Sequence, residues 1–245
     1  MNKTALRAGL AMIASVSLSA AANAAPIGPT FQTFGDLQNA TSTSVTFSGS
    51  GIPTNPAAYS VFTAGNGDEL VLGLIATPRF SNPTPTNDGA GTYTATAGLN
   101  GGRATWNFSY FAEIIDNGGG STFADFNTVL LYDLDPGVDT DEADLGVIDF
   151  GASPGVNLIQ DSQNATFGFL ASGIPGVVTP PSFTPFNANV GGEYTFAFRS
   201  TLGDVAINVN VVPTPEPAAL ALIGAGVLAL GATRIRRRSA NATAA

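Results

Sequence analysis

Apolar side chains alternate with polar ones in several short segments of the chain. Three segments show this pattern most clearly, namely 104–110, 193–199 and 205–211. Aromatic or β-branched residues occupy every second position in them, which is typical of β-strands with one buried face. Weaker patterns predict further strands at 43–48, 58–63, 69–76, 91–97, 127–133, 145–150 and 165–170.

Clusters of Gly, Pro, Asn and Ser separate the predicted strands, and no convincing helical period occurs between residues 40 and 213. Nine or ten strands at this spacing predict an all-β fold, a two-sheet antiparallel sandwich of jelly-roll type over residues 25–211. Trp106 belongs to an apolar alternation and is expected in the core. The absence of a repeat of fixed period argues against a β-helix.

The first 24 residues have the composition of a secretory signal peptide. Lys3 and Arg7 form a positive start, 8–18 is apolar, and Ala22-Asn23-Ala24 is a cleavage site with small residues at its ends. Eleven apolar residues are too few to span about 30 Å of hydrocarbon. We therefore expect signal peptidase to remove residues 1–24.

The last part of the chain has three consecutive features. A proline-rich stretch ends in Pro215, Glu216 and Pro217, an uncharged segment follows at 218–232, and then comes a basic cluster of Arg234, Arg236, Arg237 and Arg238. Fifteen residues would form a helix of about 22 Å, which is short for a permanent span. Arginines after such a helix favour the cytoplasmic side, so residues 239–245 are expected to be a cytoplasmic tail and the sandwich to lie outside.

This order of motif, apolar helix and arginine cluster over 212–238 resembles the PEP-CTERM sorting signal of Gram-negative bacteria. The usual Val-Pro-Glu-Pro is interrupted here, because Thr214-Pro215 stands between Val212-Pro213 and Glu216-Pro217. The resemblance implies that an exosortase processes the tail near the motif. It also implies an inner-membrane intermediate held by the helix, followed by release to the cell surface or the medium. A permanent single-pass anchor is the alternative.

Composition excludes several function classes. The chain has no histidine and no cysteine, so it can form neither a Ser-His-Asp triad, a cysteine nucleophile nor a disulfide. Residues 26–213 hold seventeen acidic residues against three arginines, a net charge of −14. Such a field repels nucleic acid and anionic membranes, and neither is expected as a partner of the sandwich.

An acidic segment at 132–149 carries seven carboxylates in eighteen residues. Calcium prefers six to eight oxygen ligands, and Asp133, Asp135, Asp139 and Asp141 are the candidate ligands. The spacing does not match an EF-hand. A solvated acidic loop with no ion is the alternative, since runs of like charge are usually exposed. No other cofactor is expected.

A Gly-x-Ser-x-Gly sequence at 151–155 invites comparison with a hydrolase nucleophile, but Pro154 lacks the backbone N–H that an oxyanion hole needs there. We therefore expect a turn and no enzyme. By resemblance, the chain is expected to be a structural or interaction protein of the cell surface or extracellular matrix, with exopolysaccharide or other surface proteins as partners. A carbohydrate-binding or ice-binding module is the alternative, and a glycoside-active enzyme is less favoured because no carboxylate pair is singled out.

Overall fold

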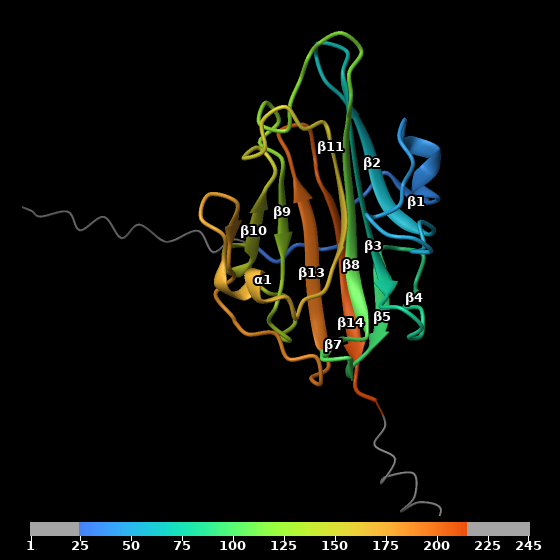
Figure 1. The fold of residues 1–245 in the computed structure, drawn as a ribbon, viewed down its shortest axis with the longest axis vertical. Helices are drawn as coiled ribbons and strands as arrows, with labels where there is room; N and C mark the ends of the chain where they lie inside the picture. The colour runs from blue at the N-terminus through green and yellow to red at the C-terminus, as the bar shows by residue number, and fades with distance from the viewer. Residues whose placement is uncertain (1–24, 215–245) are drawn as a thin grey trace, which may run out of the picture.

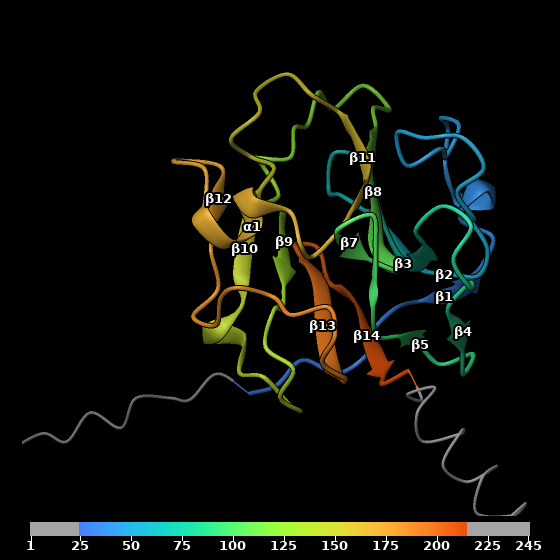
Figure 2. The ribbon, with the colours of Figure 1, turned by 60° about the horizontal axis from the view of Figure 1, so that its bottom comes forward.

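The computed structural model describes residues 25–214. Two β-sheets lie against each other in it (Figures 1 and 2). The five-stranded sheet has the order β1 (Thr33–Gly35), β2 (Ala57–Thr63), β3 (Glu69–Pro78), β8 (Trp106–Ile115) and β11 (Leu158–Gln163), and all its neighbours are antiparallel. β3 and β8 are its longest strands and pair along their whole length.

The second sheet has seven strands. Its order is β12 (Val178–Thr179), β10 (Gly146–Asp149), β9 (Val129–Tyr132), β13 (Gly192–Arg199), β14 (Val205–Val212), β5 (Thr92–Thr96) and β4 (Thr86–Asn87). β14 and β5 run parallel, whereas the other neighbours are antiparallel. The predicted β-rich architecture of two main sheets is therefore confirmed, but this second sheet is mixed instead of purely antiparallel.

Short elements complete the described part of the chain. They are the hairpin of β6 (Leu99–Asn100) and β7 (Arg103–Ala104), the 3₁₀ turns η1 (Leu37–Ala40) and η2 (Glu142–Asp144), and the helix α1 (Gly168–Ser172). The predicted signal peptide and the predicted C-terminal helix lie outside the described residues.

Two strand predictions are wrong. Segment 43–48 is a loop, because the backbone N–H groups of Thr46 and Phe47 donate to the Gln160 side chain and not to a neighbouring strand. Segment 165–170 leads into α1, and the residue that follows the helix, Gly173, has a positive φ of 77° that favours glycine. Strand β11 was not expected, because its sequence is mostly polar.

The main core lies between the sheets. Trp106, Phe108 and Tyr110 on β8 are almost fully buried, as the alternation predicted, and so are the aromatic residues Phe196 and Phe198 of β13. The rings of Phe108 and Phe196 stack with centroids 4.4 Å apart. Offset stacking of this kind adds to the gain from burying the rings, and it fixes β8 across from β13.

Candidate functional site

The outer face of the five-stranded sheet is covered by residues 36–56, here called the covering segment, which include η1 (Figure 1). Leu37 is fully buried and packs against Gly73 of β3. A Cβ at Gly73 would lie 2.7 Å from a methyl carbon of Leu37, so this close approach requires glycine. The covering segment therefore packs on the sheet through apolar contacts of its own.

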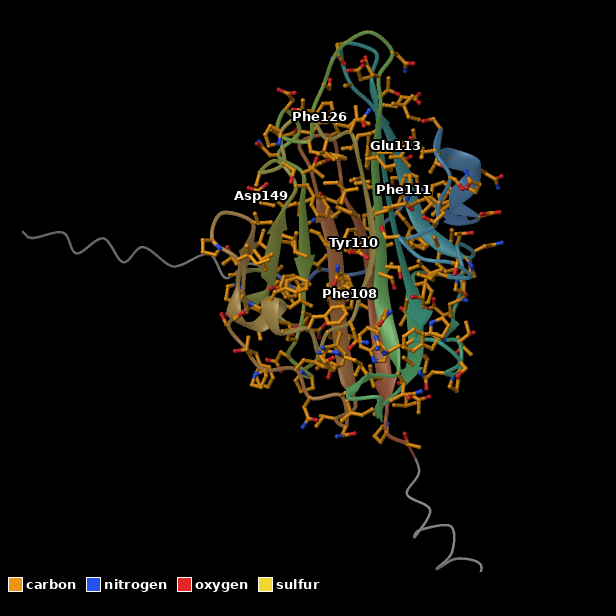
Figure 3. All side chains as sticks on the ribbon, in the orientation of Figure 1. Phe108, Tyr110, Phe111, Glu113, Phe126 and Asp149 are labelled. Atoms are coloured by element: carbon orange, nitrogen blue, oxygen red, sulfur yellow. The ribbon has the colours of Figure 1, made fainter. Side chains whose placement is uncertain are left out.

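A buried carboxylate holds the first half of the covering segment. Glu113 of β8 is only 3% exposed and accepts a hydrogen bond from the Ser42 backbone N–H at 2.9 Å. The hydroxyls of Ser42 and Thr43 donate to the same carboxylate. In Figure 3, Glu113 lies on the opposite side of β8 from Phe108 and Tyr110. Hydrogen bonds to a charged group are stronger than neutral ones, so Glu113 fixes this loop firmly.

An amide on the edge strand holds the second half. The Gln160 side-chain oxygen accepts hydrogen bonds from Thr46 and Phe47 N–H, each at 2.8 Å. The Ser48 hydroxyl donates to the Gln160 backbone carbonyl at 2.6 Å. Phe47 and Ser48 both have positive φ, 47° and 56°, which is uncommon for residues other than glycine. The contacts with Gln160 therefore hold a turn that would not be favoured alone.

A cleft of about 600 Å³ lies between the covering segment and the five-stranded sheet. Its lining comes from 47–52 of the covering segment, 78–80 after β3, Asn107 of β8 and 161–162 of β11. Its volume lies in the range of about 300–1,000 Å³ that is usual for small-molecule sites. We call it the outer cleft.

Asn107, Asp161 and Ser162 line the sheet side of the outer cleft, and a network of buried polar groups lies behind them. The Asn107 amide donates to the Ser162 hydroxyl at 3.0 Å, and Ser109 donates to the same oxygen at 2.8 Å. The Thr77 and Ser109 hydroxyls lie 2.8 Å apart, and Asn164 donates to Asn107 Oδ1 at 2.7 Å. Because Ser162 Oγ accepts twice here, its own hydroxyl hydrogen is left to donate at the lining.

Phe80 stands at the rim of the outer cleft and is 80% exposed, the highest value among the large apolar residues of 25–214. Its φ of 53° is left-handed, which is a genuine outlier for a bulky residue. The Arg79 guanidinium carbon lies 4.5 Å from the centroid of the Phe80 ring, a cation–π contact. Phe80 is thus an exposed aromatic surface held in an unusual backbone conformation.

The three arginines of the described region have different surroundings. Arg199 pairs with Glu142 and Asp204, and Arg103 donates to the Thr166 carbonyl at 2.8 Å. The Nε of Arg79 is buried and has no hydrogen-bond partner among residues 25–214. Burial, together with the nearby charge of Arg103, lowers the pKa of Arg79 from its ordinary value. Arg79 therefore brings a guanidinium group to the lining of the outer cleft, with its Nε buried below the surface.

The acidic segment lies at another part of the molecule. Asp133, at the end of β9, is 2% exposed, and it accepts hydrogen bonds from the Asp135 and Thr195 N–H groups at 2.8 and 3.5 Å. Burial raises its pKa to about 6. Asp135 is half-buried and accepts from the Gly137 N–H at 2.9 Å. These two residues are thus neighbours, and backbone N–H groups already occupy part of their oxygens.

The other two candidate ligands do not join them. Asp139 is exposed, and its N–H donates to Glu193 at 3.4 Å, while Asp141 is half-buried where its backbone bridges to Pro26. Within residues 25–214, no three His, Cys, Asp or Glu side chains are grouped so that they could hold a metal ion. The arrangement lends the calcium interpretation no geometric support, and it stays a prediction.

The remaining sequence-predicted residues fall in two places. The sorting motif Pro215–Pro217 and the basic cluster at 234–238 lie outside the described residues. The Gly-x-Ser-x-Gly segment at 151–155 forms turns, as expected.

Sequence reasoning missed the outer cleft. Phe80 belongs to no alternating pattern of apolar and polar residues. The one available signal was its position between the end of a predicted strand and the Gly/Pro/Asn-rich stretch that follows at 82–89.

Comparison with known proteins finds one match, and it concerns the end of the chain. Residues 213–238 match the PEP-CTERM protein-sorting motif. No curated protein and no solved structure shows significant similarity to the chain. The motif implies an exported protein that an exosortase processes and delivers to the cell surface. Among residues 25–214, no helix is long and apolar enough to cross a membrane.

Proposed function

We propose that the protein is a non-catalytic interaction protein of the cell surface or extracellular matrix, where its sandwich associates with exopolysaccharide. The position of the sorting motif supports this proposal most. The motif begins at residue 213, directly after β14 ends at Val212. The sorting signal therefore follows the last core strand without a linker. Because the two are directly connected, processing of the tail by the exosortase determines where the folded sandwich is retained.

Composition supports a non-catalytic role. A chain without histidine or cysteine lacks the side chains that most often act as general base or strong nucleophile near neutral pH. Ser153 lies in a turn and precedes Pro154, which has no N–H to stabilise an oxyanion. Structural and binding roles need neither group.

Among the alternatives, the outer cleft favours a carbohydrate-binding module over an ice-binding one. A concave site with a polar lining and an exposed ring suits a small, hydroxyl-rich ligand. Ice binding needs a flat array of regularly spaced groups, and the cleft is not flat. Binding of carbohydrate also agrees with a role in the matrix.

The test is the location of the protein in three strains of its host: wild type, a strain without exosortase, and a strain without exopolysaccharide. We expect surface or matrix protein in wild type, full-length precursor in the inner membrane without exosortase, and protein released to the medium without exopolysaccharide. Intact mass should place the ends of the mature chain near Ala25 and near Pro215–Pro217. Retention that is unchanged without exopolysaccharide would contradict the proposed association.

A further inference from the structure

We propose that the outer cleft binds a neutral saccharide unit, with Phe80 as the stacking surface and Arg79 and Ser162 as hydrogen-bond donors. The inference rests on the proposed function and deepens it, because it names the site and the chemical class of the ligand. The observations that carry it are the lining of the cleft, the exposure of Phe80, and the polar groups of Arg79 and Ser162 in the lining.

The ring of Phe80 meets the first requirement of sugar recognition. One side of a pyranose ring is a patch of C–H groups, which packs on an aromatic face. Phe80 is 80% exposed beside the cleft, and Arg79 contacts its ring. A large apolar side chain in a left-handed conformation costs free energy, and such outliers cluster at binding sites. A ligand that covers the ring would gain apolar burial that the free protein lacks.

The lining of the cleft meets the second requirement of sugar recognition, which is a set of fixed polar groups that can form hydrogen bonds with the hydroxyls of the sugar. Arg79 lines the cleft and offers the planar N–H donors of its terminal guanidinium nitrogens, since its Nε is buried. The Ser162 hydroxyl already accepts two hydrogen bonds and is left to donate. Ser48 donates to the Gln160 carbonyl, so its oxygen is left to accept. Neighbouring sugar hydroxyls act as both donors and acceptors and can satisfy such a mixed set.

The charge of the molecule favours a neutral sugar over an acidic one. The cleft lining includes one arginine and also Asp161. Residues 26–213 carry a net charge of −14, so a polyanion such as a polyuronate would be repelled on approach. A neutral glucan, galactan or mannan meets no such barrier.

Hydrogen bonds hold the covering segment, which supplies one wall of the cleft, on the sheet. Glu113 and Gln160 hold the covering segment with five hydrogen bonds from Ser42, Thr43, Thr46 and Phe47. A site that is formed before the ligand arrives loses less conformational entropy on binding. This support suits a ligand such as a single saccharide unit, which offers few atoms for contact.

The experiment is calorimetric titration of the exported protein, purified from its host, with dextran, galactan and mannan, and with polygalacturonate as the anionic probe. We expect binding of at least one neutral polysaccharide, with little change between 50 and 500 mM salt. Phe80→Ala should weaken that binding at least tenfold. Arg79→Lys keeps the charge but loses the planar donor set, and it should weaken binding about three- to tenfold.

The matched control is Phe183→Ala, which removes another exposed phenylalanine, one that lies by the acidic segment and outside the outer cleft. It should leave binding unchanged. Because Phe80 is exposed, the melting temperature of Phe80→Ala should equal that of wild type. A loss of binding in this variant would then not be caused by unfolding. Equal binding by wild type and Phe80→Ala overturns the site. Binding to none of the neutral probes, or salt-sensitive binding of polygalacturonate alone, overturns it as well.

The two proposals can fail separately. If Phe80→Ala protein is retained in the matrix as well as wild type, the site is wrong and the matrix role stands. If wild-type protein is retained equally with and without exopolysaccharide, the matrix association itself is wrong, whatever the titration shows.

Discussion

The two faces of strand β8 differ in chemistry, because the inner face is apolar whereas the outer face carries three polar residues beside the buried Phe111. Phe108 and Tyr110 on the inner face pack against the seven-stranded sheet, with Phe108 stacked on Phe196. On the outer face, Glu113 holds the covering segment, whereas Asn107 and Ser109 donate to Ser162 of β11, and Asn107 also lines the outer cleft. Adjacent residues of one strand thus have different roles, because successive side chains of a strand point to opposite faces. The inner face stabilises the sandwich, and the outer face holds the covering segment and contributes to the outer cleft.

The largest expected effect comes from the inner face. Phe108→Ala removes a fully buried ring and leaves a cavity, so we expect a loss of about 3–5 kcal/mol in the free energy of unfolding, measured with urea. Asn107→Ala, one residue away, removes hydrogen bonds on the outer face and should cost only about 1 kcal/mol. Equal losses for the two variants would show that the faces do not differ as described.

Glu113→Ala should loosen the covering segment more than the sandwich. The backbone N–H of Ser42 and the two nearby hydroxyls lose a charged acceptor, and the expected cost is about 2–4 kcal/mol, local to residues 36–56. Hydrogen exchange followed by mass spectrometry should show faster exchange in that segment and unchanged exchange in β13. Uniformly faster exchange throughout the protein would mean that Glu113 supports the whole fold.

The buried carboxylate of Asp133 predicts a pH effect. Its pKa is raised to about 6 in the folded protein from 3.8, so the folded state takes up a proton that the unfolded chain does not hold between these values. Stability from this group is therefore present below about pH 4 and lost as the pH rises through 6, by about 2–3 kcal/mol at most.

Urea unfolding at pH 5 and pH 7 measures this effect. The free energy of unfolding should depend less on pH in Asp133→Asn than in wild type, whereas Asp139→Asn, at an exposed position, should behave as wild type does. The same pH dependence in all three proteins would contradict the assignment to Asp133.

A smaller effect tests the calcium interpretation of the acidic segment. If its carboxylates bind calcium only in the folded state, a tenfold excess over Kd stabilises by about 1.4 kcal/mol, and the melting temperature rises by about 3–6 °C. The comparison is calcium against chelator, with magnesium as control, in wild type and in the Asp133→Asn, Asp135→Asn double variant. A rise that persists in the double variant places the ion elsewhere, and no rise leaves a solvated loop.

How far the sequence predicts the structure differs between the two faces. The alternation of Phe108 and Tyr110 reflects burial against a second sheet, so the inner face and most strands were predictable. The outer face is covered by a loop whose contacts join residues more than 70 positions apart, such as Ser42 and Glu113 or Thr46 and Gln160. No local pattern encodes such contacts. The helix α1 was missed because five residues are too few to show a helical period.

The candidate site was predicted least well. Phe80 is identified by its exposure and its left-handed backbone, and neither property can be recognised in a single sequence. The acidic segment, in contrast, was conspicuous in the sequence, yet the fold separates its carboxylates, burying Asp133 and leaving Asp139 exposed. The amino-acid composition shows how many charged residues a segment has, but the path of the backbone determines whether their side chains lie close together.

The most direct test of the outer face as the binding face is hydrogen exchange of the exported protein with and without the neutral polysaccharide that it binds in titration. We expect slower exchange at 47–52 and 79–80, which line the outer cleft, and no change at 133–144 in the acidic segment. Slower exchange at the acidic segment, with none at 47–52 or 79–80, would contradict the assignment of the outer cleft as the saccharide site.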